Sequence, residues 1–214
     1  MEAALRYIDD RGLDALSMHK LGAELGVKGM SLYNHVDNKD DLLDGVLELL
    51  FSEVERAAPA SDDWRQGMRV FAHALRDVVR RHPHAAPLIT SQRAIPVPAL
   101  RVVQAHITSS MHGGTSEAEA YALLRTITWY ALGAGLVQVS WGIAVHGCAP
   151  AVSDLLPPGV PHDLVRVAEV YCGQSDPDAE FELGLDLMLR GVESRGPSSP
   201  RSPRRPRTPT PQAG

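Results

Sequence analysis

The fold of the first fifty residues is decided by the stretch Ser17-Met18-His19-Lys20-Leu21-Gly22-Ala23-Glu24-Leu25-Gly26-Val27-Lys28-Gly29-Met30-Ser31-Leu32-Tyr33-Asn34-His35-Val36. Two crossed helices need small residues where they approach, a glycine in the tight turn, and apolar anchors that fix the crossing angle. Gly22 and Ala23 supply the close approach and Gly26 the turn, and the anchors are Leu21, Leu25, Val27, Leu32 and Val36. The stretch therefore predicts a helix-turn-helix motif, although structural helical hairpins can imitate this pattern.

The same geometry leaves one face of the later helix of this motif pointing outward. That face carries Lys28, Gly29, Met30, Ser31, Asn34 and His35. In a helix-turn-helix protein this face enters the major groove, so the sequence predicts double-stranded DNA as a partner. The net charge of −5 argues against a general nucleic-acid coat protein. A sequence-specific binder needs only a small positive footprint.

Apolar residues at helical spacing extend the all-α prediction along the rest of the chain, and no strand pattern competes with it. Glycines end the first two helices, Ser17 is a good N-cap, and Ser61 or Asp62 is expected to cap the helix after residue 63. We expect helices at about 1–12, 17–25, 28–35, 38–57, 64–81, 84–91, 96–112, 116–146, 161–172 and 178–193, with a loop over 147–160. These segments predict a helix-turn-helix domain over 1–50 and a larger helical bundle over 51–194.

The segment 126–146 holds twenty-one residues without Asp, Glu, Lys or Arg. Its length alone is compatible with a transmembrane span. Gln138, Ser140 and three glycines within it argue against a span. A helix that is apolar on all sides is also what the centre of a bundle requires, and we favour that interpretation.

Composition places the chain among helix-rich cytoplasmic proteins with no membrane partner. The sequence is 44% apolar, 5% aromatic and 22% charged, and its N-terminus reads as an amphipathic helix rather than a signal peptide. Its two cysteines, Cys148 and Cys172, make neither a disulfide framework nor a metal-ligand spacing, so no cofactor or metal is predicted. Residues 195–214, rich in Pro and Arg, predict a disordered tail that either adds non-specific DNA affinity or is dispensable.

The motif and its flanks together resemble the tetracycline-repressor (TetR) family. The resemblance covers residues 1–50, and a second segment, 181–193, is similar to the tetracycline-repressor-like C-terminal domain. It rests on Leu16-Ser17, Leu21-Gly22-Ala23-Glu24-Leu25-Gly26-Val27, Ser31-Leu32-Tyr33-Asn34-His35-Val36, Asn38-Lys39-Asp40-Asp41-Leu42-Leu43 and Phe181-Glu182-Leu183-Gly184-Leu185-Asp186-Leu187-Met188-Leu189-Arg190-Gly191-Val192-Glu193. It implies a homodimeric repressor that binds an operator and is released by a small-molecule inducer. It also implies residues ahead of Met1, which lies inside the first helix here, so we expect the native start to lie upstream.

The resemblance implies DNA-contacting roles for individual residues. Tyr33, His35 and Lys39 would face phosphates, the last of them at the favourable N-terminal end of its helix. Base contacts would fall to Lys28, Gly29, Met30, Ser31 and Asn34, with Met18 and His19 at the groove edge. Met30 suits a thymine methyl group and Lys28 suits guanine. Each residue keeps an alternative: Tyr33 as a packing residue, Lys39 as a solubilising charge, and the two histidines as solvated side chains.

The resemblance further implies a small-molecule cavity between residues 64 and 146. A ligand site is usually apolar with a few fixed polar groups, although most apolar candidates here are equally suited to a core. The candidates are Phe71, Leu75, Leu88, Ile89, Arg93, Val103, Gln104, Ile107, Thr108, Met111, Trp129, Tyr130 and Val137. Tetracycline itself is not expected, because Leu88-Ile89-Thr90 stands where the type repressor holds magnesium with a histidine.

The expected dimer pairs the helices 116–146 and 178–193 with their symmetry mates in a four-helix interface. Ala131, Gly133, Ala134 and Gly135 would allow close helix approach. Two recognition helices about one DNA turn apart, roughly 34–36 Å, predict a pseudo-palindromic operator. An enzyme is disfavoured because no nucleophile elbow, phosphate loop or paired-carboxylate motif occurs. A DNA-binding activator or architectural protein without a ligand stays open as an alternative.

Overall fold

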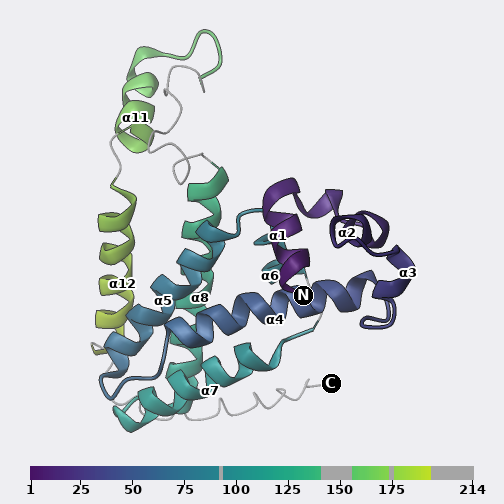
Figure 1. Cartoon of the computed structure of the whole chain (residues 1–214). Coiled ribbons are helices and arrows are strands. Elements are labelled where there is room, and N and C mark those ends of the chain that lie inside the picture. The colour runs from purple at the N-terminus through teal and green to yellow at the C-terminus, as the bar shows by residue number, and fades with distance from the viewer. Residues whose placement is uncertain (92–93, 141–155, 174–175, 194–214) are drawn as a thin grey trace, which may run out of the picture.

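The computed structural model describes residues 1–91, 94–140, 156–173 and 176–193, and over these ranges the chain is helical without strands (Figure 1). The predicted all-α class is therefore confirmed. The elements in chain order are α1 (Glu2–Arg11), η1 (Leu13–Ala15), α2 (Met18–Glu24), α3 (Gly29–Leu32), α4 (Lys39–Ala57), α5 (Trp64–Arg81), α6 (Pro87–Ser91), α7 (Val97–His112), α8 (Glu117–Ser140), α11 (His162–Gly173) and α12 (Pro177–Glu193).

A small head, formed by α1, α2 and α3, packs on the N-terminal half of α4 at one end of the molecule (Figure 1). Leu42, Val46 and Leu50 recur every four residues on α4 and are all buried. They form one core with Ala4 and Ile8 of α1, both completely inaccessible. A helix with a continuous apolar stripe buries that stripe against whatever flanks it. The long α4 thereby joins the head to the rest of the chain.

The larger part of the molecule is a bundle in which α5 packs against α8, and α7 and α12 flank them (Figure 1). Ala131 is fully buried, and a Cβ atom added at Gly135 would lie 2.8 Å from Cγ1 of Val79 on α5. These small residues of α8 therefore serve packing inside one protomer. The expectation that Ala131 and Gly135 lie in a dimer interface is wrong, because the side of α8 that carries these small residues packs against α5.

Side-chain caps define where three helices begin. Ser17 Oγ accepts a hydrogen bond from the backbone N–H of Lys20 at 3.2 Å, and Asn38 Oδ1 accepts one from Asp41 at 2.9 Å. Asp63, rather than the expected Ser61 or Asp62, caps α5 by accepting from the N–H groups of Arg65 and Gln66. Such oxygens satisfy donors that the first helical turn leaves unpaired.

Several element boundaries differ from those expected. The helix expected over 28–35 is only Gly29–Leu32, because residues 33–35 continue it as a turn. The helix expected over 84–91 is only Pro87–Ser91, because a proline suits the first position of a helix. The end of the helix expected over 116–146, most of the loop 147–160 and the tail 195–214 lie outside the described residues. No helix in the described part of the chain is long and apolar enough to cross a membrane. The predicted boundary at residue 50 falls inside α4 and stays a prediction.

Candidate DNA interface, regulatory pocket and dimer face

Two glycines make the crossing of α2 and α3 possible. A Cβ atom added at Gly22 would lie 2.8 Å from the backbone nitrogen of Gly29 and 2.9 Å from its Cα. A Cβ atom at Gly29 would in turn lie 3.1 Å from Cα of His19. Gly26, with φ of +68°, forms the turn, in a region that other residues rarely adopt. Gly29, expected among the base-contacting residues, is therefore also a packing residue, which the sequence pattern did not reveal.

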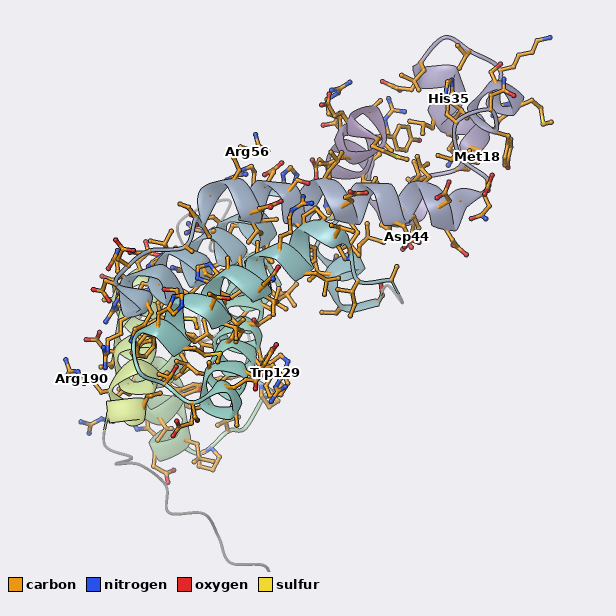
Figure 2. The ribbon with its side chains drawn as sticks, turned by 90° about the horizontal axis from the view of Figure 1, so that it is seen from below. Met18, His35, Asp44, Arg56, Trp129 and Arg190 are labelled. Carbon is orange, nitrogen blue, oxygen red and sulfur yellow. The ribbon has the colours of Figure 1, made fainter. Side chains whose placement is uncertain are left out.

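The outward face predicted for the motif is exposed at the tip of the head, where Figure 2 labels His35. Met30 is 76% exposed and Tyr33 45% exposed. The other exposed members of the predicted DNA-binding set are His19, Lys28, Ser31, Asn34, His35 and Lys39. This surface offers amines, a hydroxyl, an amide and a thioether to a groove, which are the groups that read base edges and phosphates.

Three side chains of the motif lie differently from expectation. Met18 was expected at the groove edge but is only 8% exposed, because it packs into the core shared with α1 and α4. Leu25 and Val27 were expected as anchors but are 45% and 44% exposed. The turn between α2 and α3 lies at the surface, so the core takes its anchors from Leu21 and Val36 and from helices outside the motif.

The corner between α5 and α6 contacts the head through polar groups. Nδ1 of His82 lies 2.7 Å from a carboxylate oxygen of Asp9 on α1, and Nδ1 of His84 lies 2.8 Å from the Asp9 carbonyl oxygen. Nε2 of His82 lies 3.3 Å from Glu53 on α4, which also pairs with Arg81. These contacts tie the segment between α5 and α6 to both α1 and α4.

The predicted ligand-binding residues differ in burial, and their role in a ligand site stays a prediction. Phe71, Leu75, Leu88 and Ile107 are buried in the core, and Ile89, Val103 and Tyr130 are half-buried against it. The exposed candidates are Gln104, Thr108, Met111, Trp129 and Val137, and Arg93 lies outside the described residues. The reason is that α8 carries no charged residue after Arg125, so that its composition could not show which face of this part turns inward.

A pocket of about 490 Å³ lies between α5 and α12. Its lining residues are His73, Arg76, Asp77, Arg80, Asp178, Ala179 and Glu182, and none of them is among the predicted ligand-binding residues. Arg76 is 1% exposed. The sequence does indicate the burial of Arg76. This residue stands four residues after Ala72 and three before Val79, so a cation occupies the buried stripe of α5.

Ion pairs hold α12 against α5 below this pocket. Arg69 donates to both Glu182 and Asp186, and His73 contacts the other oxygen of Glu182. The hydrogen bond from Arg69 holds the pKa of the Asp186 carboxyl below its ordinary value. Both carboxylates are thus engaged within the protomer.

His106 of α7 is a buried titratable group away from the pocket. Its Nε2 lies 3.2 Å from the carbonyl oxygen of Ala58, to which it donates, and its ring packs against Phe71 at 5.3 Å between centroids. Burial lowers the pKa of His106 below its ordinary value of 6.5. The folded protein therefore holds this side chain neutral at pH values where the unfolded chain binds a proton.

We expect this histidine to make the folded state acid-sensitive. Because the unfolded state binds more protons, the free energy of unfolding falls as pH drops below about 6.5, by up to about 1.4 kcal/mol per pH unit for this one group. His106→Gln should flatten the dependence between pH 7.5 and 5.5, measured by urea denaturation. His112→Gln, at the exposed end of the same helix, is the control. Identical pH dependence in wild type and His106→Gln would contradict this prediction.

A continuous apolar surface runs over α8 and α12. On α8, Trp129 and Val137 are 68% and 51% exposed and stand either side of Gly133 at four-residue intervals. On α12, Leu183 and Leu187 are 60% and 65% exposed at the same interval. Figure 2 shows Trp129 on the bundle, away from the head. We call these two rows, Trp129-Gly133-Val137 and Leu183-Leu187-Gly191, the apolar face.

The two rows adjoin because α12 packs directly on α8. The ring of Tyr130 stacks on Phe181 with 5.0 Å between centroids and an angle of 4° between planes. The Tyr130 hydroxyl donates to the carbonyl oxygens of Glu180 and Phe181 at 3.1 and 3.2 Å. A large exposed apolar patch of this kind marks an interaction site in soluble proteins.

An exposed helix-turn-helix at the end of a long helix, attached to a helical bundle with an apolar face, defines the class of bacterial one-component transcription regulators. Comparison with known families agrees. Residues 1–46 match the family described as "Bacterial regulatory proteins, tetR family", and residues 57–195 match "Tetracyclin repressor-like, C-terminal domain". The chain therefore belongs to the TetR family of transcriptional regulators.

Individual relatives include the tetracycline repressor class A of transposon 1721 from Escherichia coli. It is 28% identical over 199 residues, which span 91% of this chain and 89% of the relative. The ActR protein of Streptomyces coelicolor, solved in complex with actinorhodin, superposes with a TM-score of 0.73 at 27% identity, covering 90% and 94% of the two chains. BioQ, solved with its double-stranded DNA operator, superposes with a TM-score of 0.62 at 25% identity, covering 91% and 95%.

Proposed function

We propose that the chain is a homodimeric repressor that binds a pseudo-palindromic operator and is released by a small-molecule inducer. The observation that carries the proposal is the exposed face around Lys28, Met30 and Asn34, held outward by the glycine contact between α2 and α3. This face has the size and position of a recognition element for the major groove. BioQ, solved with its DNA operator, supports the proposed operator binding. ActR, solved in complex with actinorhodin, supports the proposed response to a small molecule.

The apolar face supports the proposed homodimer. Two adjacent helices carry four large apolar side chains that are each more than half exposed. Burial of these side chains against the same surface of a second copy is favourable. Pairing these rows across a twofold axis forms a four-helix interface with a glycine in each row. The two heads then lie symmetrically at its end, so each half of the operator is read by one α3.

DNA contacts divide between backbone and bases. Lys39 opens the 19-residue helix α4, where the helix dipole favours a phosphate, and Tyr33 and His35 are exposed beside it. Lys28, Met30, Ser31 and Asn34 are assigned to base edges, and His19 to the rim of the groove. Backbone contacts set the position of the head, while base contacts select the sequence.

The test of this proposal is selection of bound duplexes from random DNA with the full chain. We expect an inverted repeat whose half-sites lie about one helical turn apart, roughly 10 base pairs. A reporter under that sequence should be repressed by the regulator. Recovery of unrelated sequences, or activation of the reporter, would overturn the repressor proposal.

Lys39→Ala should weaken operator binding about tenfold and reduce the slope of log affinity against log salt concentration by about one. The reason is that one phosphate contact and its released counterion are lost. Fluorescence anisotropy from 50 to 300 mM salt measures both quantities. Arg56→Ala is the matched control, because Arg56 is exposed on the same helix at its other end, remote from the head in Figure 2. Equal slopes for the two variants would remove Lys39 from the interface.

A further inference from the structure

The largest fully buried side chain of the described residues is that of Arg76, in the middle of α5. Its Nε donates to Oε1 of Gln138 at 3.2 Å, and its Nη2 donates to the carbonyl oxygen of Pro177 at 3.3 Å. Its guanidinium carbon lies 4.4 Å from the centre of the Phe181 ring. These neighbours are neutral, so they orient the cation without balancing its charge.

The charge is balanced by one carboxylate that is itself in water. Nη2 of Arg76 lies 2.6 Å from Oδ1 of Asp178. The side chain of Asp178 is 74% exposed, whereas that of Arg76 is 2% exposed. Arg80 lies 3.8 Å from the same carboxylate oxygen. A buried cation thus meets an exposed, replaceable counter-ion at the wall of the pocket between α5 and α12.

We propose that this pocket binds a small organic acid whose carboxylate replaces that of Asp178 on Arg76. A buried charge left unpaired is strongly unfavourable, but exchange of one carboxylate for another keeps the pair intact. Separation of Asp178 from Arg76 costs the Asp178 carboxylate little free energy, because its side chain is already hydrated. The volume of about 490 Å³ is in the range of small-molecule sites. This inference rests on the proposed ligand response and names the chemical class of the ligand and its anchor.

The exchange acts on α12, which carries half of the apolar face. Asp178 and Pro177 stand in the first turn of α12, less than about three turns from Leu183 and Leu187. Arg76 holds this turn through both residues, while Asp176 caps it by accepting from the N–H groups of Asp178 and Ala179. Loss of the Asp178 contact removes the charged restraint from the start of α12. A ligand that favours the released state shifts the dimer toward a different arrangement of its heads.

The experiment is isothermal titration of the full-length dimer with benzoate, and with benzamide as its neutral isostere, at constant ionic strength. We expect benzoate to bind and benzamide not to bind. Asp178→Asn removes the internal competitor and should tighten benzoate binding about tenfold, if the open site is populated about one tenth of the time. Asp77→Asn is the matched control: it removes the same charge from the same pocket without vacating Arg76, and its affinity should stay within about threefold of wild type.

Arg76→Gln should abolish benzoate binding, with folding checked by thermal denaturation. If that variant does not fold, the difference in benzoate affinity between Asp178→Asn and Asp77→Asn decides alone. Equal benzoate affinity in these two variants, equal binding of benzamide, or no benzoate binding to Asp178→Asn would overturn the inference. Operator binding by the ligand-free wild type is measured in parallel. Its absence would count against the proposed repressor function, whereas the benzoate titrations test the pocket.

Discussion

Leu187→Glu is expected to convert the dimer into a monomer and to abolish operator binding at nanomolar concentrations. Leu187 is 65% exposed in the single chain and stands at the centre of its row on α12. In the proposed dimer this position lies in the interface twice, so each dimer of the variant would bury two carboxylates without partners. An uncompensated buried charge costs about 3–5 kcal/mol, and about 4 kcal/mol corresponds to a thousandfold change in the dissociation constant.

Sedimentation velocity over a concentration series measures the monomer–dimer equilibrium, and anisotropy measures operator affinity. Leu100→Glu is the matched control, since Leu100 is 52% exposed on α7 and lies outside the apolar face. The control should remain dimeric and bind the operator as the wild type does. A dimeric Leu187→Glu protein would show that the two chains associate through another surface.

Gly22→Ala is expected to destabilise the head by roughly 1–3 kcal/mol and to weaken operator binding about a hundredfold, as overpacking forces backbone shifts. The new methyl group would lie within 3.0 Å of Gly29 N, Gly29 Cα and the carbonyl oxygen of Val27, and all three are backbone atoms. Alanine is otherwise the better residue inside a helix by about 1 kcal/mol. The sign of the effect is therefore decided by the contact with α3, which must move away from its recognition position.

Gly45→Ala is the control for this change. Gly45 is also inside a helix, in the half of α4 on which the head packs, but a Cβ atom there would meet only the flexible end of Met1. We expect Gly45→Ala to keep or raise the unfolding free energy and to keep operator affinity. Urea denaturation and anisotropy, applied to both variants, separate sterics from helix propensity. Unchanged operator binding by Gly22→Ala would show that α3 tolerates displacement.

The helices themselves were predictable because the interactions that define them are local. The four-residue spacing of Leu42, Val46 and Leu50 indicated the buried side of α4, and Ser17 marked a helix start that its hydrogen bond confirms. Gly26 marked the turn through its positive φ. Resemblance to a known family added the class of protein, and the family matches confirm it.

The site was less predictable because its residues are defined by partners far away in the chain. Met18 fits the motif pattern equally well in the core or at the surface, and only the packing of α1 and α4 buries it. The ligand candidates were chosen for apolar character, which cannot separate core residues such as Leu75 from exposed ones such as Trp129. Arg76 was overlooked because an arginine in an apolar stripe does not reveal its counter-ion 102 residues later.

By itself the sequence determined the presence of the helices, the cap at Ser17, the turn and the helix-turn-helix motif, because each depends on atoms within a few residues of one another. The tertiary structure alone decided that Gly29 is a packing contact, that one side of the uniformly apolar α8 stays exposed, and that Arg76 meets Asp178 beside a pocket. The physical reason is that burial and ion pairing depend on which helices meet, and the local pattern of a helix does not specify its neighbours.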